Sequence, residues 1–153
     1  MPQLLTSQEI VAILSSLIAC LTSLKDMRIP NWLTFPAALL GLAINAYDGK
    51  ALNSIFGWIL MVFLGVPGKA KLSFGAIKQL AAIGAALGSL AGFVNFVVFS
   101  IVYLLVSLTY LRSADNELDK AKLSKKLIPL GPMILISTIL TVSCLRAFAI
   151  KVP

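Results

Sequence analysis

The sequence predicts an all-α polytopic membrane protein with six transmembrane helices in a single domain, residues 1–153. Hydrophobic residues make up 59% of the chain and charged residues 12%, whereas a soluble domain carries about 25% charged residues. The mean hydropathy is +0.96. In lipid, backbone polar groups must be satisfied internally, so only helices and closed barrels can span a bilayer. The apolar runs are long and do not alternate with polar residues, which favours helices over barrel strands.

Long uncharged runs define the predicted helices, and they cover residues 10–24, 29–47, 51–68, 79–111 and 127–145. A spanning helix needs about 20 residues, which the first run reaches if it extends back across Glu9. As one helix, the run 79–111 would be about 50 Å long, against a hydrocarbon core of about 30 Å. We therefore expect two helices there, with a turn within residues 88–92, where two glycines weaken the helix.

The basic residues support this count of helices. With six helices, all but three of the thirteen basic residues fall on one side of the membrane. The exceptions are Lys50, Arg146 and Lys151. Because short cytoplasmic loops are enriched in Lys and Arg, the basic side is predicted to be cytoplasmic. Both termini, and the loop that contains Lys50, would then lie outside.

Small and aromatic residues give expectations about packing. Gly84, Gly88 and Gly92 recur at every fourth position, a spacing that lets helices approach closely. Gly88 and Gly92 are also candidates for the turn, so the two uses compete. Trp58 lies in the middle of a predicted helix, away from the membrane interfaces where tryptophan is enriched, and we expect it to pack within the bundle.

Composition excludes several classes of function. The formal charge of +7 is spread through the loops between apolar runs, which indicates membrane topology rather than nucleic-acid binding. Cys20 and Cys144 lie within apolar runs and lack the spacing of a zinc site. The chain has no histidine, the commonest metal ligand and general base. We therefore predict no metal, no cofactor and no nucleic acid, with the lipid bilayer as the main environment.

Two short segments interrupt the apolar runs. Residues 23–34 read SLKDMRIPNWLT and residues 74–84 read FGAIKQLAAIG. Together they resemble the two active-site motifs of the prepilin peptidases, intramembrane aspartic proteases that process type IV pilins. The family motifs read Asp, five residues, Ile-Pro-Asn, and Gly-Asp-x-Lys-Leu-Leu-Ala-Ala-Ile-Gly. The resemblance is to the short, peptidase-only branch and covers nearly the whole chain, and both segments fall on the predicted cytoplasmic side.

The resemblance implies an activity and a set of site residues. The family cleaves the leader of a prepilin or pseudopilin at the cytoplasmic face of the bacterial inner membrane, without a cofactor. Its two catalytic aspartates correspond to Ser23 and Ala76 here. The matching positions that would shape the site are Pro30, Asn31, Gly75 and Lys78.

The residues at the two aspartate positions predict an inactive chain. Two close carboxylates can share one proton, so that one takes a proton while the other gives one. The hydroxyl of Ser23 cannot act as a base near neutral pH, and Ala76 has no titratable group. Without histidine there is no Ser–His arrangement to activate Ser23, and we do not favour a Ser–Lys pair of Ser23 with Lys25 or Lys78.

Two alternatives stay open at this point. Asp26 would be the first catalytic aspartate if the segment before Ile29 were three residues shorter, but Lys25 and Arg28 flank it, which is typical of a charge-paired surface residue. The other alternative is a non-enzymatic scaffold or transporter-like subunit of a pilus assembly or secretion system. Transporters usually carry an ionisable residue within the membrane, and no apolar run here contains one. A scaffold would fit the missing aspartates but would not explain the paired motifs.

Overall fold

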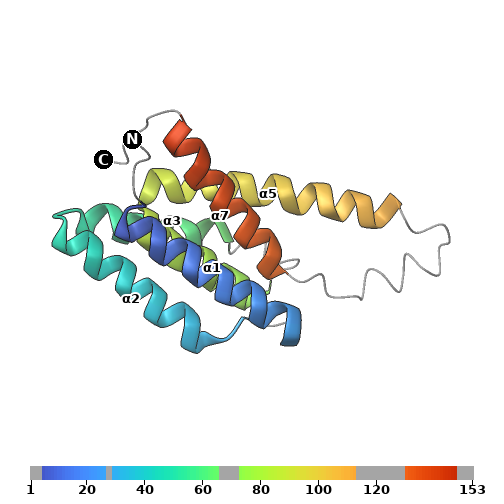
Figure 1. Cartoon of the computed structure of the whole chain (residues 1–153), viewed down its shortest axis with the longest axis horizontal. Helices are drawn as coiled ribbons and strands as arrows, with labels where there is room; N and C mark the ends of the chain where they lie inside the picture. Colours follow the sequence, from blue (N-terminus) through green and yellow to red (C-terminus); the bar gives the residue numbers. More distant parts are fainter. Residues whose placement is uncertain (1–4, 27–28, 66–72, 113–129, 148–153) are drawn as a thin grey trace.

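The computed structural model describes residues 5–26, 29–65, 73–112 and 130–147, and all regular structure within them is helical. The described helices are α1 (Ser7–Asp26), α2 (Asn31–Tyr47), α3 (Ala51–Gly65), α4 (Phe74–Leu87), α5 (Ser89–Arg112) and α7 (Leu130–Ala147). They pack side by side as a bundle, and the second half of α5 extends past the other helices (Figure 1). The all-α prediction is confirmed for these residues.

Three of the described helices are long and apolar enough to cross a membrane, namely α1, residues Ser89–Thr109 of α5, and α7. The expectation of six such helices is therefore met in part. α3 has 15 residues and α4 has 14. At a rise of 1.5 Å per residue they are about 22 Å long, which is shorter than a hydrocarbon core of about 30 Å.

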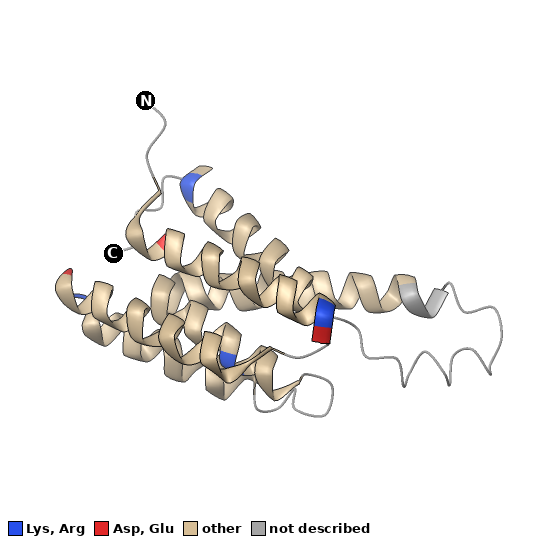
Figure 2. Ribbon diagram, turned by 60° about the horizontal axis from the view of Figure 1, so that its bottom comes forward, with Lys and Arg blue, Asp and Glu red and all other residues tan. Residues whose placement is uncertain are grey.

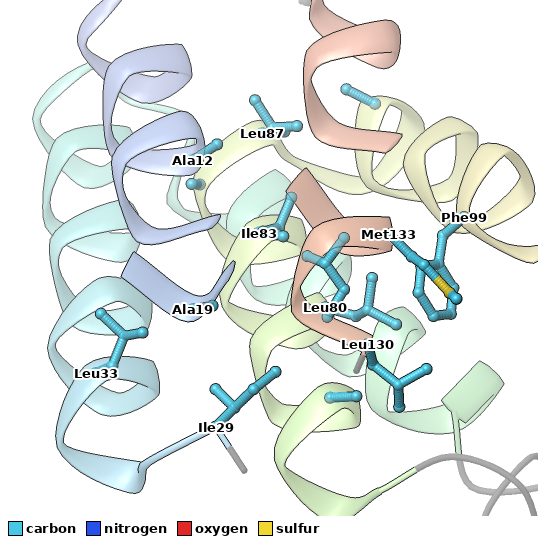
Figure 3. Packing of buried hydrophobic residues seen from close by; sticks show 14 of the residues in the cluster. Ala12, Ala19, Ile29, Leu33, Leu80, Ile83, Leu87, Phe99, Leu130 and Met133 are labelled. Carbon is cyan, nitrogen blue, oxygen red and sulfur yellow. The ribbon is translucent and has the colours of Figure 1, made fainter. Parts of the chain in front are cut away.

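α4 is the central helix of the bundle. Every residue from Gln79 to Leu87 is buried, and α4 contacts α1, α2, α3, α5 and α7. Figure 3 shows apolar side chains from several helices gathered around it, with Ile29 and Leu130 close to one end of α4. A helix that is apolar on all sides is buried on all sides. The other helices surround α4, so its short length does not expose its polar backbone ends to lipid.

The predicted turn between α4 and α5 lies at Gly88. Gly88 has a φ of 86°, in the left-handed region that glycine adopts without steric cost and that often ends a helix. The turn is tied to α3, because the side-chain oxygen of Asn53 accepts hydrogen bonds from Ser89 N (3.1 Å) and Ser89 Oγ (2.6 Å). The prediction of two helices within residues 79–111 is confirmed.

The glycines near this turn bring three helices into close contact. A Cβ added to Gly92 of α5 would lie 3.0 Å from Gly84 Cα, and a Cβ added to Gly57 of α3 would collide with Gly84 O. Gly84 therefore packs closely against both α3 and α5. Gly88 serves both uses, because it forms the turn and also lies against Gly57 of α3, while Gly84 and Gly92 serve packing alone.

Trp58 corrects one expectation. Its side chain is 43% exposed on the outer surface of α3 and does not pack within the bundle. The preceding residue, Gly57, is buried against α4. Successive residues on a helix are rotated by about 100°, so a residue next to the contact face points away from it.

The bundle has two distinct ends, and its described charged residues lie near them (Figure 2). We call the end that contains the two motif segments the motif end, and the other the opposite end. The opposite end contains the start of α1, the α2–α3 connection, Gly88 and the end of α7. It is marked by an ion pair between Glu9 Oε2 and Arg146 Nη2 (2.6 Å) and by a hydrogen bond from Gln8 Nε2 to Asp48 Oδ2 (2.9 Å). The predicted cytoplasmic loop with Lys120–Lys126 lies outside the described residues.

Candidate functional site

The two motif segments meet at the motif end of the bundle. Lys78 Nζ in α4 donates a hydrogen bond to Asn31 Oδ1 at the start of α2, over 2.9 Å. A Cβ added to Gly75 would lie 2.8 Å from the carbonyl oxygen of Ile29. The backbone of the second motif therefore lies directly against the first motif, and a larger residue at position 75 would push the two apart.

Pro30 and Asn31 set the direction of α2. Pro30 is the N-cap residue with φ −76° and ψ 146°, an extended conformation that suits its fixed ring. Its carbonyl accepts a hydrogen bond from Leu33 N over 3.2 Å. No side chain caps this helix, which leaves the side-chain oxygen of Asn31 for Lys78. The proline thus fixes where α2 begins, and the asparagine joins that start to α4.

Lys78 lies between aromatic rings at the surface. Its Nζ is 5.0 Å from the ring centroid of Phe74 and 5.7 Å from that of Phe35. Both rings are largely exposed, at 58% and 61%. An ammonium group over an aromatic face is attracted by the ring quadrupole. These contacts and the bond to Asn31 hold the amine at the rim of the motif end rather than directing it toward Ser23.

Ser23 lies inside the motif end, on α1. It is 2% exposed, and its Oγ accepts a hydrogen bond from Gly131 N over 3.2 Å. Gly131 is the second residue of α7, where backbone N–H groups lack an acceptor within their own helix. A Cβ added to Gly131 would lie 2.6 Å from Ser23 Cβ. Ser23 therefore joins α1 to the first turn of α7.

Ala76 lies in the first turn of α4 and is fully buried. Its N–H is directed to the N-cap residue Ser73, 3.3 Å from the hydroxyl and 3.0 Å from the carbonyl oxygen. Ala76 belongs to the same apolar core as Ala19 of α1 and Leu130 of α7, the neighbours of Ser23 and Gly131 along their helices. Both aspartate positions of the family motifs are thus buried at the motif end, Ser23 where α1 meets α7 and Ala76 in the first turn of α4.

The motif end lacks a carboxylate pair among the described residues. Asp26, the last residue of α1, is exposed to solvent. Glu9 and Asp48 lie at the opposite end, and the acidic residues at 115, 117 and 119 lie outside the described residues. The interior of the motif end offers a hydroxyl and a methyl group where acid–base chemistry would need two carboxylates. Among the described residues, the interior of this end therefore offers packing surfaces and hydrogen-bonding groups but no pair of carboxylates.

Sequence reasoning overlooked Gln79. The side chain is fully buried, and neither Nε2 nor Oε1 has a hydrogen-bond partner in the described part of the chain. A signal was present in the sequence, because the family motif has leucine at this position and the chain has glutamine. Buried polar groups nearly always have partners, so this exception requires an explanation.

A second set of buried polar residues crosses the middle of the bundle. Ser16 Oγ of α1 lies 3.1 Å from Thr138 Oγ1 of α7, and Thr141 Oγ1 of α7 donates to Asn95 Oδ1 of α5 over 3.3 Å. All four residues are fully buried. Hydrogen bonds of this type between helices are common in membrane bundles. They fix the register of three helices and lie apart from the motif end.

Comparison with known proteins finds no match to the chain among protein-family models, curated proteins or solved structures. The fold and the site define a helical bundle with three helices suited to span a membrane and one end where two polar motifs converge. The functional argument depends on the residues and contacts of that end.

Proposed function

We propose that the chain is a prepilin-peptidase-like protein of the bacterial inner membrane that binds a prepilin or pseudopilin without cleaving it. In this proposal all six helices of the sequence prediction are embedded in the membrane. The basic motif end faces the cytoplasm, and both termini lie outside. An active parent of this type would be an aspartic endopeptidase that removes the leader at the cytoplasmic face.

The observation that carries the proposal is the contact between the two motifs. They are separated by about forty residues of sequence, yet Lys78 bonds to Asn31 over 2.9 Å and Gly75 packs against Ile29. Ser23 and Ala76 are buried at the same end. Convergence of this kind is what a two-motif active site requires, and it supports the resemblance more strongly than either segment alone.

Loss of hydrolysis need not mean loss of binding. Each position that corresponds to a family aspartate holds a small residue here, so the proton-sharing pair is missing while the surrounding helices remain. Apolar residues such as Trp32 and Phe74 remain exposed at this end, at 65% and 58%. A basic leader would gain little from a chain of net charge +7. The apolar helix of the pilin would therefore provide most of the binding free energy by packing against the bundle.

Restoring both carboxylates is the experiment that tests this function. Ser23→Asp combined with Ala76→Asp should create leader cleavage of a purified prepilin in detergent, and either change alone should give little or none, because the pair works as a unit. The unaltered chain should leave the prepilin intact. The matched control is Asp26→Asn, which should leave restored cleavage nearly unchanged because Asp26 is exposed.

Two outcomes of that assay would contradict the assignment. Efficient cleavage by the unaltered chain would refute the proposal that it is inactive. Full cleavage by Ala76→Asp alone, abolished by adding Asp26→Asn, would make Asp26 the first catalytic residue in place of Ser23. The buried positions also predict a cost in stability, since an ionised carboxylate is poorly tolerated away from water. Melting temperatures of all variants should therefore be measured beside the rates.

The proposed topology has a separate test. A single cysteine at position 50 should react with a membrane-impermeant maleimide added outside intact cells, and a cysteine at position 122 should react after the membrane is opened. The endogenous Cys20 and Cys144 are replaced by serine in both variants. Strong outside labelling at position 122 would contradict the six-helix arrangement.

A further inference from the structure

The carboxamide of Gln79 is the unexplained group in the second motif. The residue is 0% exposed, and its donor and its acceptor both lack a partner among the described residues. An unpaired buried polar group is unfavourable for folding, and the surrounding residues Leu80 and Ile83 are apolar. A leucine, as in the family motif, would fit this apolar setting without that penalty. The glutamine therefore reduces the stability of the resting bundle without a visible benefit to it.

Helix geometry puts Gln79 on the face of α4 that carries the motif. Residues three and four positions apart share a helix face, so Gln79 shares one with Gly75 and Ala76. Long side chains on a helix lean toward its N-terminus and cover the preceding turn. For Gln79 that turn contains Gly75 and Ala76 of the second motif. The carboxamide thus lies next to the position where the family has its second catalytic aspartate.

We propose that Gln79 binds a peptide unit of the pilin segment beside Ala76, donating from Nε2 to a carbonyl oxygen and accepting at Oε1 from a backbone N–H. This inference rests on the proposed function and adds the residue and the chemistry of recognition. A carboxamide offers one donor group and one acceptor, which match the acceptor and donor of a peptide unit. It does not titrate, so it can hold a peptide without hydrolysing it.

The bound segment enters between α4 and the first motif. The two are held together there by close packing rather than by many polar bonds. Gly75 of α4 lies against the backbone of Ile29, and Ser23 of α1 lies against Gly131 of α7 with one hydrogen bond of 3.2 Å between them. Parting these contacts exposes the face of Gln79, and the peptide then supplies the missing hydrogen bonds. The stability lost to an unpaired amide in the free protein is recovered in the complex, which makes binding depend on this one side chain.

Replacement of Gln79 by leucine separates stability from binding. The probe is a fluorescent synthetic peptide that contains a prepilin leader and the first half of the pilin helix, titrated against the purified chain in detergent micelles. Gln79→Leu should raise the melting temperature by about 2–4 °C, because it removes the unpaired amide. It should also weaken peptide binding by about tenfold or more, as expected for losing two hydrogen bonds. Gln79→Met, closer in shape, should behave in the same way.

Asn95→Leu is the matched control. Asn95 is also a fully buried amide with an unpaired Nδ2 among the described residues, but it lies on α5, away from the motifs. Its replacement should leave peptide affinity within about twofold of the unaltered chain. Equal peptide binding by Gln79→Leu and the unaltered chain would overturn the inference while leaving the proposed function intact. A fall in the melting temperature of Gln79→Leu with unchanged peptide binding would mean that the Gln79 amide binds an internal water instead. Failure of the unaltered chain itself to bind the peptide would overturn both proposals.

Discussion

The two ends of the bundle are held together in different ways. At the opposite end, polar side chains join helices that are distant in sequence. Glu9 pairs with Arg146 over 2.6 Å. Asn45 Nδ2 donates to the carbonyl oxygens of Ala85 (3.0 Å) and Ala86 (2.9 Å) and to that of Gly41 in its own helix. These bonds tie α1, α2, α4 and α7 into one framework.

The motif end has fewer polar contacts between its described helices. In the described part of the chain, its helices are joined by the Lys78–Asn31 bond at the surface and the Gly131–Ser23 bond in the interior. Elsewhere the contact is between glycine, alanine and apolar side chains. Such contacts can part and close again without leaving charges or many backbone groups unpaired. This difference is consistent with the proposal that the opposite end holds the bundle together while the motif end opens to a ligand.

The largest expected effect comes from the fixed α3–α4 contact. Gly57→Ala would bring a methyl group against Gly84 O and within 2.7 Å of Gly88 C, where rigid backbone cannot yield. We expect a loss of about 3 kcal/mol or more in the free energy of unfolding, measured by SDS titration. Gly75→Ala, whose methyl would meet Ile29 O at 2.8 Å, should cost less than half as much, because the motif end can shift. A larger loss of stability for Gly75→Ala than for Gly57→Ala would contradict this comparison of the two ends.

Removal of a polar contact should also lower the free energy of unfolding more at the opposite end than at the motif end. Asn45 is buried, and Asn45→Ala removes the hydrogen bonds that its amide donates to three carbonyl oxygens, so the free energy of unfolding should fall by about 2–3 kcal/mol. Lys78→Met loses one partly exposed hydrogen bond and the contacts with two rings, and should cost no more than about 1 kcal/mol. Equal losses in the same SDS titration would mean that both ends stabilise the fold to the same degree.

Much of the helix arrangement could be predicted from the sequence. Helix-breaking glycines revealed the Gly88 turn, and the spacing of Gly84 and Gly92 revealed their close packing. Hydropathy could not reveal that α4 is enclosed by protein, because an apolar side chain suits either lipid or a protein core. The same ambiguity explains Trp58, which was expected to pack within the bundle but lies on its outer surface.

The candidate site was predicted in position but not in detail. The motifs identified Ser23 and Ala76, and the charge pattern put both at one end. The bond between Ser23 and Gly131 spans 108 residues, and no local pattern encodes such a partner. Gln79 was visible as a departure from the family motif, but its lack of a partner depends on what the other helices bring around it.

Site-specific photocrosslinking tests most directly whether the motif end is the one that receives the pilin. A benzoylphenylalanine in place of Phe74 at the motif end is compared with one in place of Tyr47 at the opposite end. Both are exposed aromatic residues, at 58% and 94%, so the control position is the more accessible of the two and exposure alone would favour crosslinking there. With purified prepilin in detergent, irradiation should give a covalent adduct from position 74 and little or none from position 47. An equal or stronger adduct from position 47 would contradict the account.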